Sequence, residues 1–440
     1  MAGTTPGAGL GEIAVVGGGI GGLAAALRLA GLGAKVTLYE ASDQLGGLGT
    51  FFHYRSIHLE RFYHCMLPSD RHLLGLLREL DLEGEVYWKQ TSFGFMTRGE
   101  LYPLNTPLEL LRFRPLPWIS RLRVGATGLW GRLRSSRGLD QVTCVEWLTR
   151  LSGRRAFETF WRPMLQAKFG DRYHEVPALW FWTRFNREKG AGPERKGYIR
   201  GGYKRIIDAL AARLERQGTT LHLDAPVDRL DMDEQDRIVL AAGGKPARTF
   251  DRVVITAPAA FMRQATAGGR LSPLAAKADA GIDIQGVVNA AFMLRRPLTP
   301  HYWVAAIDAD IPFQGVVEST TLLDLEDTAG VHLFYVMNYL HRSEPAFSRP
   351  EETILDEYQA GLQRLFPELR PEDFIDRFLF RSPFVEPLYT TGYLQRQPPQ
   401  VLWPHRVYLA NTTQVYPEVT SWNGAVGGIE RLIERIQSGG

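Results

Sequence analysis

The hydrophobic pattern at the start of the chain predicts a β-strand, a tight turn and a helix. Residues 13–16 form a short apolar run, residues 17–22 hold five glycines, and residues 23–30 have the composition of a buried helix. A second strand is predicted over 35–40. A strand, a helix and a strand in this order favour a parallel sheet with the glycine turn at the end of its first strand.

The pattern then changes character several times along the chain. Leucine spacing predicts a helix over 71–80, a proline-containing connection is expected over 101–107, and residues 108–187 are predicted to be mainly helical. The later predicted elements are a helix over 205–216, strands over 220–223 and 252–256, antiparallel strands within 282–339, a strand over 406–410 and a helix over 423–436.

These segments predict an α/β chain, α+β overall, with two domains that alternate along the sequence. A Rossmann-like domain is expected to combine residues 1–100, 196–262 and 398–440. Residues 101–195 and 263–397 are expected to form a second domain of helices and an antiparallel sheet. The length of 440 residues is typical of a chain with more than one core.

Composition and charge then exclude several classes of protein. Hydrophobic residues make up 45% of the chain and charged residues 22%, which is typical of a globular protein. A net charge of +3 gives no strong overall field, so no nucleic-acid partner is expected. Cys65 and Cys144 are the only cysteines, and no Cys and His spacing suits a metal ion. We therefore expect no metal site and a reducing compartment.

The first residues favour a cytoplasmic location. They lack the basic segment of a secretory signal, and the apolar run over 13–27 ends at Arg28. That run is shorter than the roughly 20 residues that a membrane-spanning helix needs. The sequence therefore predicts no transmembrane helix.

The glycine turn has the spacing G-x-G-x-x-G, which is informative because a strand precedes it and a helix follows it. Gly17 is expected to make the tight turn and Gly19 to let the backbone approach a pyrophosphate. Gly21 lies in the same loop, and Gly22 is expected to let helix and strand pack closely. Glu40, at the end of the next strand, can accept hydrogen bonds from a ribose diol. A glycine-rich turn without a ligand is the alternative.

A second glycine pair, Gly46 and Gly47, follows this acidic residue. The segment 41–50 resembles FAD-binding proteins of the flavin amine oxidase and protoporphyrinogen oxidase superfamily. In that superfamily the second loop lies along the FAD diphosphate. Residues 198–202 and 224–228 are similar to a later FAD segment, which implies that the backbone of Val227 meets the adenine.

The resemblance extends to the end of the chain. Residues 250–258, 407–411 and 422–426 are similar to the remaining motifs of the superfamily. It implies that Asn411 contacts FAD and that the helix beginning near Gly424 and Ala425 directs its N-terminus at the flavin. No cysteine lies near that segment, so non-covalent FAD is expected.

The sequence departs from the superfamily pattern at two places. Gln44 and Leu45 stand where an arginine usually precedes the second glycine pair. Asn411, Thr412 and Thr413 stand where a glycine and an acidic residue are usual. The diphosphate and ribityl contacts of FAD are therefore expected to be made differently in this chain.

The catalytic residues are less well marked than the cofactor residues. Amine oxidases carry a lysine near flavin N5, and alignment with their strand puts Asn289 at that position. Residues 61–64 resemble the segment of UDP-galactopyranose mutases whose histidine lies against the flavin, which makes His64 the candidate catalytic residue. Residues 167–170 and Arg184 resemble the same enzymes. A structural role for His64 is the alternative.

These features predict an FAD-dependent oxidoreductase that transfers a hydride from a C–H bond of a bulky or apolar organic substrate to flavin N5. One alternative is a redox-neutral isomerase, similar to the mutases, that acts on a sugar nucleotide. Another is a flavin-binding scaffold without catalysis. Six aromatic residues could line a substrate cavity or belong to the core: Trp180, Trp182, Trp303, Tyr335, Tyr389 and Trp422.

Residues 109–137 interleave apolar side chains with arginines. Such a pattern is typical of a helix that lies on a membrane surface, so peripheral membrane contact is one interpretation. The other is a pair of helices that pack on the core and expose arginine to water. Apart from a small-molecule substrate, no partner is predicted, and the oligomeric state stays open.

Overall fold

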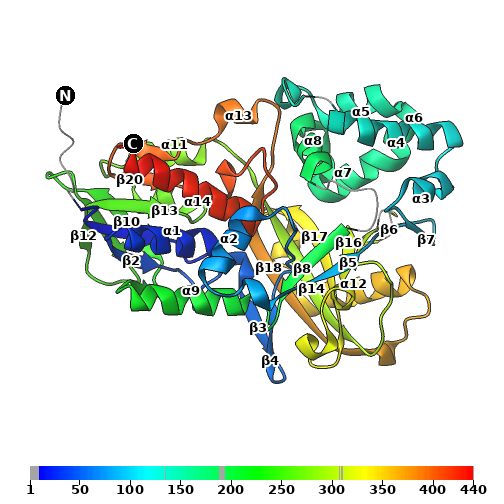
Figure 1. The fold of residues 1–440 in the computed structure, drawn as a ribbon, viewed down its shortest axis with the longest axis horizontal. Helices are drawn as coiled ribbons and strands as arrows, with labels where there is room; N and C mark the ends of the chain where they lie inside the picture. The colour runs from blue at the N-terminus through cyan, green and yellow to red at the C-terminus, as the bar shows by residue number, and fades with distance from the viewer. Residues whose placement is uncertain (1–8, 134, 188–193, 307, 309–310, 440) are drawn as a thin grey trace.

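The computed structural model describes residues 9–133, 135–187, 194–306, 308 and 311–439. Figure 1 shows a parallel sheet with its helices at one end of the molecule and a group of helices at the other, with long antiparallel strands beside both. The α/β class, with one Rossmann-like sheet and one mostly antiparallel sheet, is thereby confirmed.

The six-stranded sheet combines three distant parts of the chain. Its order is β19-β20-β13-β1-β2-β9. The strands are β1 (Glu12–Val16), β2 (Lys35–Tyr39), β9 (Thr220–His222), β13 (Arg252–Ile255), β19 (Val401–Trp403) and β20 (Val407–Leu409). All neighbours are parallel except β19, which is antiparallel to β20.

Alternating residues of β1 reach two different cores. Ile13 and Val15 belong to a core that they share with the helices α1 (Ile20–Gly31), α9 (Lys204–Arg216) and α14 (Trp422–Gln437). Ala14 and Val16 belong to a core on the other face, below the sheet of β10 (Val227–Met232), β11 (Ile238–Ala242) and β12 (Arg248–Phe250). Because both faces are covered, residues 13–16 of the strand are all apolar.

The second large sheet has the order β18-β14-β17-β16-β15-β6-β7. Its strands are β6 (Phe93–Thr97), β7 (Glu100–Pro103), β14 (Ile284–Leu294), β15 (Trp303–Ala306), β16 (Gly315–Glu318), β17 (His332–His341) and β18 (Phe374–Pro387). Only β15 and β6 are parallel. Helix α12 (Glu351–Leu365) covers one face, and the other face joins the core of the parallel sheet.

The region 108–187 is mainly helical, as predicted. Its α-helices are α3 (Pro107–Arg112), α4 (Trp118–Leu133), α5 (Cys144–Ser152), α6 (Arg154–Ala156), α7 (Arg162–Phe169) and α8 (Ala178–Arg187). They surround a core of their own that is rich in Phe and Trp. Figure 1 shows this group apart from α1, α9 and α14.

Smaller elements connect these parts. They are the hairpin of β3 (Phe51–Tyr54) and β4 (Ile57–Glu60), the pair of β5 (Val86–Thr91) and β8 (Glu194–Ile199), and the helices α2 (Arg71–Glu79), α10 (Met262–Ala265), α11 (Ser272–Asp279) and α13 (Tyr393–Arg396). No helix of the described residues is long and apolar enough to cross a membrane.

Two local expectations differ from the structure. The connection expected over 101–107 holds strand β7, which tolerates Pro103 because it lies at the edge of its sheet. Helix α1 begins at Ile20 rather than at residue 23, so Gly21 and Gly22 belong to its first turn. The domain boundaries stay a prediction.

Candidate functional site

The glycine turn closes the end of β1 against the neighbouring strands. Gly17 has a φ of 106°, and its N–H donates to the carbonyl of Tyr39 over 2.8 Å. A Cβ added to Gly22 would lie 1.8 Å from the carbonyl oxygen of Gly17. A side chain at either position would therefore strain the turn or push helix α1 away from the strand.

The second glycine pair lies directly against this turn. Gly19 forms a β-bridge with Gly46, whose N–H donates to the carbonyl of Gly18 over 2.8 Å. A Cβ on Gly47 would lie 3.2 Å from the Cα of Gly19. Gly19 caps α1 without a side-chain hydrogen bond, and the first turn of α1 holds no acidic residue. Within α1 itself, no side chain neutralises the positive dipole end at its N-terminus.

Glu40 ties the end of β2 to the glycine turn. Its carboxylate accepts from the N–H of Gly18 at 2.6 Å and from the N–H and hydroxyl of Ser42 at 3.0 and 2.8 Å. The carbonyl of Glu40 accepts from the N–H of Ala225, which brings the half-buried Val227 to the same edge of the sheet. The predicted residues from 17 to 47 and Val227 therefore meet at the carboxyl ends of β1 and β2.

The predicted residues of the carboxy-terminal segment already have partners within the protein. The amide of Asn411 donates to the carbonyl of Ala257, and its side-chain oxygen accepts from the N–H and hydroxyl of Thr413. The hydroxyl of Ser421 accepts from the N–H of Gly424, and the carbonyl of Ser421 accepts from the N–H of Ala425. Asn411 also lines a cavity of about 180 Å³. Their contacts with a cofactor stay a prediction.

His64 lies among aromatic rings that come from distant segments. Its ring centre is 4.9 Å from that of Tyr203, before α9, and 5.7 Å from that of Trp422, the first residue of α14. Trp422 in turn reaches the second glycine loop, where a Cβ on Gly49 would lie 2.3 Å from its ring. His64 is therefore connected to the glycine site through Trp422.

The hydrogen bond and burial of His64 fix its protonation. Nδ1 lies 2.7 Å from the carbonyl oxygen of Phe62, which can only accept, so Nδ1 carries the hydrogen. Burial lowers the pKa of His64 to about 4. The imidazole is therefore neutral at pH 7, with its Nε2 lone pair available.

Tyr63, the neighbour of His64 in sequence, belongs to a different cluster. Its hydroxyl lies 3.1 Å from that of Tyr339, and its ring centre lies 5.7 Å from Trp303 and 6.4 Å from Tyr335. Burial raises the pKa of Tyr63 well above its ordinary value. Lys168 places its Nζ 3.6 Å from the ring centre of Tyr339. We call the four aromatic residues of this group the Tyr63 cluster: Tyr63, Trp303, Tyr335 and Tyr339.

Asn289 holds the segment that carries both clusters. Its amide donates to the carbonyl of Arg61 over 2.7 Å, and the residue is 1% exposed. An amide cannot take up a proton as a lysine amine can. Asn289 therefore positions the 61–64 segment from strand β14.

A comparison with known protein families matches residues 20–426 to the model described as flavin containing amine oxidoreductase. The chain belongs to this family. A likeness to the structure of reduced UDP-galactopyranose mutase, with a TM-score of 0.76 and 18% identity, covers 97% of this chain and 94% of that one. It supports the fold alone.

Curated members of the flavin-containing family match with low identity. Amine oxidase B of Sus scrofa is 29% identical over 238 residues, which are 48% of this chain and 45% of that protein. Zeta-carotene desaturase of Solanum lycopersicum is 27% identical over 181 residues, which are 36% and 31%. The chain spans about half the length or less of the curated relatives it matches.

Sequence reasoning missed a buried carboxylate where this flavoprotein's two large sheets meet. Glu60 is 4% exposed, and its carboxylate accepts from the Tyr198 hydroxyl and the Tyr203 N–H, each over 2.7 Å. Its carbonyl accepts from the hydroxyl of Tyr335. Burial raises the pKa of Glu60. The one feature of the sequence that could have indicated this site is the Gly-Gly pair before Tyr203. A Cβ on Gly202 would lie 2.8 Å from the Glu60 carboxylate, so the position needs a glycine.

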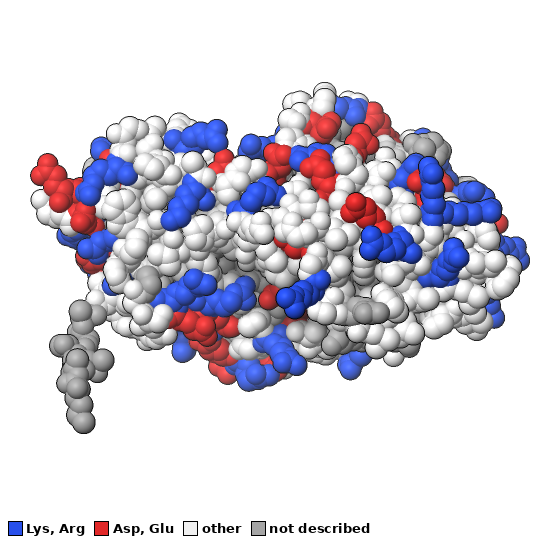
Figure 2. Space-filling view, turned by 90° about the horizontal axis from the view of Figure 1, so that it is seen from above, with Lys and Arg blue, Asp and Glu red and all other residues white. Residues whose placement is uncertain are grey.

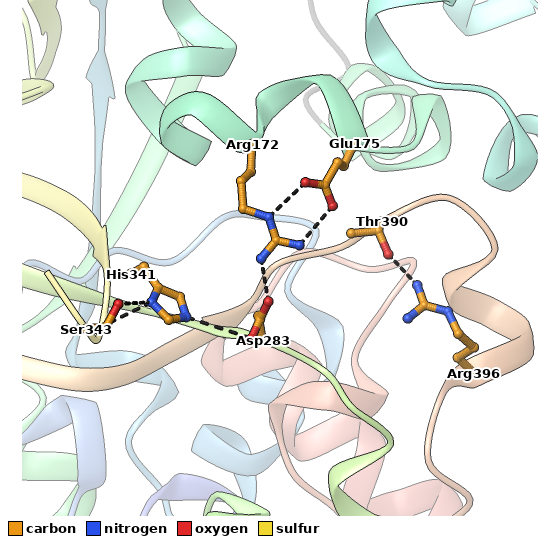
Figure 3. A network of polar contacts seen from close by, with 7 residues as sticks. All are labelled: Arg172, Glu175, Asp283, His341, Ser343, Thr390 and Arg396. Atoms are coloured by element: carbon orange, nitrogen blue, oxygen red, sulfur yellow. Dashed lines mark hydrogen bonds and ion pairs between the residues drawn. The ribbon is translucent and has the colours of Figure 1, made fainter.

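A second polar network ties the helical region to the antiparallel sheet. Figure 3 shows Arg172 pointing at Glu175, 2.8 Å away, and at Asp283, which also faces His341 at 3.8 Å. These ion pairs raise the pKa of Arg172 and lower those of Glu175 and Asp283. A cavity of about 250 Å³ lies beside the network, and Arg172, Glu175 and Asp283 line it. The network therefore acts as a structural clamp.

The predicted aromatic residues fall into separate places. Trp303 and Tyr335 belong to the Tyr63 cluster and Trp422 lies beside His64, whereas Tyr389 stacks on Tyr416 and contacts Tyr393. The ring of Trp180 carries the guanidinium of Arg184 at 4.1 Å. Trp182 lies partly buried against the core of the helical region. Among the described residues, no group of three or more metal-ligating side chains is close enough to hold an ion.

Proposed function

We propose that this chain is an FAD-dependent oxidoreductase that oxidises a bulky, apolar organic substrate by removing a hydride from one of its C–H bonds. The observation that carries the proposal is the position of the 61–64 segment. It presents His64 to the aromatic residues beside the glycine loops and Tyr63 to the antiparallel sheet. One segment thus contacts both the predicted cofactor side and the predicted substrate side.

The residues at the glycine turn fit the adenosine and diphosphate parts of FAD. Gly17, Gly19 and Gly22 leave the backbone open at the N-terminus of α1, where phosphate groups are stabilised by N–H groups and the dipole. Glu40 offers carboxylate oxygens for a ribose. The second loop, Gly46–Gly47, would continue the contact toward Trp422. When bound, FAD supplies the hydride acceptor at N5.

The Tyr63 cluster favours an apolar substrate. Aromatic rings form its wall, and the nearby amine of Lys168 lies 2.6 Å from the carboxylate of Glu386, so its charge is balanced. The hydroxyls of Tyr63 and Tyr339 can orient one polar atom of a substrate. The carotene in the name of the tomato relative is an apolar molecule of this kind.

The protonation states of Tyr63 and His64 suit residues that orient a substrate rather than residues that exchange protons with it. Tyr63 keeps its proton and His64 stays neutral across the neutral pH range, because burial moves both pKa values away from 7. Asn289, at the position of the amine-oxidase lysine, donates its amide to the backbone. Hydride removal from a C–H bond suits such a site, since the chain's own residues then need only position the substrate.

The test is anaerobic mixing of the FAD-loaded chain with a panel of apolar polyenes, amines and nucleoside-diphosphate sugars, followed by the visible flavin absorption. Bleaching by an apolar C–H donor supports the proposal. Isomerisation of a sugar nucleotide that needs dithionite and shows no net electron flow would establish the redox-neutral alternative. Bound FAD that no panel member bleaches would favour a scaffold and contradict the proposal.

His64 is tested in the same assay by His64→Ala, with the exposed His58→Ala as the control. Loss of the imidazole that packs beside Tyr203 and Trp422 should shift the flavin spectrum and slow bleaching, while His58→Ala should change neither. Unchanged spectrum and rate in His64→Ala would remove His64 from the site.

A further inference from the structure

Exposed apolar side chains are concentrated on one surface of the helical region. Twelve large apolar side chains are exposed in the described part of the chain, and eight of them lie within residues 108–133. They are Leu108, Leu111, Trp118, Ile119, Leu122, Leu129, Trp130 and Leu133. We call this the α3–α4 surface. Single exposed apolar residues are ordinary, but a cluster of this kind marks an interaction surface.

The orientation of α4 explains why these side chains face outward. At about 100° per residue, Trp118, Leu122, Leu129 and Leu133 fall within about 60° of one another around the helix. The buried positions Ser120, Val124, Thr127 and Gly131 lie on the opposite side. The inward face is therefore made of small or short side chains, and the large apolar ones point away from the protein.

The large apolar side chains of α4 therefore do not pack on the core of the helical region. Trp118 is 67% exposed and Leu133 is 74% exposed. The same helical geometry places Arg121 and Arg123 on the two borders of the apolar face. An apolar face between basic borders is typical of a helix that lies in the interface of a bilayer.

The charged side chains of this surface are mostly positive, and its one acid, Glu109, accepts from the N–H groups of Asn105 and Thr106. Residues 110–139 contain seven arginines and no Asp, Glu or Lys. Arg112, Arg114, Arg123 and Arg137 are exposed, and none of them forms an ion pair with any residue that the structure describes. Figure 2, which looks down on the molecule from above, shows blue side chains, red side chains and white surface together over the end that holds the helical region.

We propose that the α3–α4 surface docks on an anionic phospholipid bilayer. The apolar side chains would enter the boundary between headgroups and acyl chains, with the two tryptophans at the depth that indole rings prefer. The flanking arginines would extend to the phosphates. The proposal concerns attachment to one leaflet and holds whatever substrate the flavin site oxidises.

A second copy of the chain fits this surface less well. A symmetric contact between two α3–α4 surfaces would bring the arginines of one copy against those of the other. No acidic residue within 110–139 could balance them. Lipid phosphates supply the missing negative charge, and acyl chains supply the apolar partner.

The experiment is co-sedimentation of the full-length chain with phosphatidylcholine vesicles, with and without phosphatidylglycerol. We expect binding to the anionic vesicles that weakens as salt is raised, and little binding to phosphatidylcholine alone. Leu122→Ser/Leu129→Ser should weaken binding about tenfold or more. Arg112→Gln/Arg123→Gln should weaken it and reduce its salt dependence.

Matched controls use the same substitutions elsewhere on the surface. Leu32→Ser/Leu325→Ser removes two other exposed leucines, and Arg213→Gln/Arg216→Gln removes two other exposed arginines. Both should bind vesicles like the unchanged chain. Thermal unfolding and FAD content of every variant report on its fold.

Three results would overturn the proposal. One is a folded chain that stays in the supernatant with anionic vesicles at low salt. Another is equal loss of binding in the control variants. A third is a dimer without lipid that Leu122→Ser/Leu129→Ser converts to a monomer while vesicle binding is absent, which would make a second copy the occupant.

Discussion

The predicted cofactor side and the predicted substrate side of the site meet at residues 63–64, but they are built from different contacts. On the cofactor side, backbone N–H groups of Gly17 and Gly46 donate to backbone carbonyls. On the substrate side, side chains from three or more elements pack together, such as Tyr63, Trp303 and Tyr339. A Cβ at Gly17, Gly18 or Gly22 would lie within 3 Å of other atoms, whereas a side-chain cluster can change its chemistry without changing the fold. We therefore expect a chain built in this way to tolerate a change of substrate more readily than a change of cofactor.

The largest effect is expected on the cofactor side. In Gly22→Ala the new Cβ would lie 1.8 Å from the carbonyl oxygen of Gly17, so α1 must move. We expect FAD affinity to fall about 100-fold or more, or the chain to fail to fold, because such strain costs about 3 kcal/mol or more. FAD titration and thermal unfolding measure both.

Gly31→Ala is the matched control in the same helix. Nothing lies within 4 Å of a Cβ at Gly31, so binding and stability should stay close to those of the unchanged chain. A Gly22→Ala variant that folds and binds FAD as tightly as Gly31→Ala would contradict the geometry of the turn.

A pH effect is expected from the antiparallel sheet. Burial raises the pKa of Glu318, in β16, to about 7, above its ordinary value of 4.5. A raised folded-state pKa means that the stabilisation is fully present below about pH 4.5 and is lost as the pH rises through 7. The loss amounts to about 3 kcal/mol at most. Urea unfolding at pH 5 and pH 8 measures it.

Glu318→Gln should make the stability of the chain less dependent on pH over this range. The exposed Glu326→Gln is the control and should keep the original profile. If Glu318→Gln keeps the full pH dependence, the effect comes from other groups.

A smaller effect is expected at the point where the two sides meet. Tyr63→Phe removes the hydroxyl that pairs with Tyr339 at 3.1 Å. One hydrogen bond is worth about 1 kcal/mol, so the KM for a polar-tipped substrate should rise about fivefold. FAD affinity should not change, because the hydroxyl faces the sheet. Tyr54→Phe, which removes a hydroxyl paired with Asp376, is the control for the same substitution elsewhere. Equal changes in FAD affinity and KM would contradict the division into two sides.

The smallest effect is expected from Asp283→Asn in the Arg172 network. These groups are about 40% exposed, so their ion pair contributes less than about 1 kcal/mol. Its hydrogen bond with Arg172 lowers the pKa of Asp283, so the contribution is present above the ordinary pKa of 3.8 and is lost as the pH falls below it. Thermal unfolding at pH 7 and pH 3 should show a small difference between variant and unchanged chain that decreases at pH 3. A difference that is larger at pH 3 than at pH 7 would exclude an electrostatic cause.

The glycine turn could be predicted from the sequence because its contacts are local. Gly17, Gly22 and Glu40 lie within 24 residues, and each has a residue type that the backbone geometry demands. The fold class could be predicted for the same reason, because the hydrophobic pattern of each strand and helix is set by its own residues.

The rest of the site depends on contacts that no local pattern encodes. His64, Tyr203 and Trp422 are more than 130 residues apart from one another and meet only when three segments pack. Glu60 is one of 48 acidic residues, and only its burial among tyrosines sets it apart. The amphipathic pattern of α4 was visible, but which of its faces points outward depends on the helices that pack beneath it.

The central claim is that the glycine turn and the His64–Trp422 pair border one bound FAD. The most direct measurement is a titration of the purified, cooperatively folded chain with FAD, followed by flavin absorbance and tryptophan fluorescence. We predict binding of one FAD per chain, with quenching of tryptophan emission that Trp422→Phe largely removes. A folded chain that binds no FAD, or whose quenching is unchanged in Trp422→Phe, would contradict it.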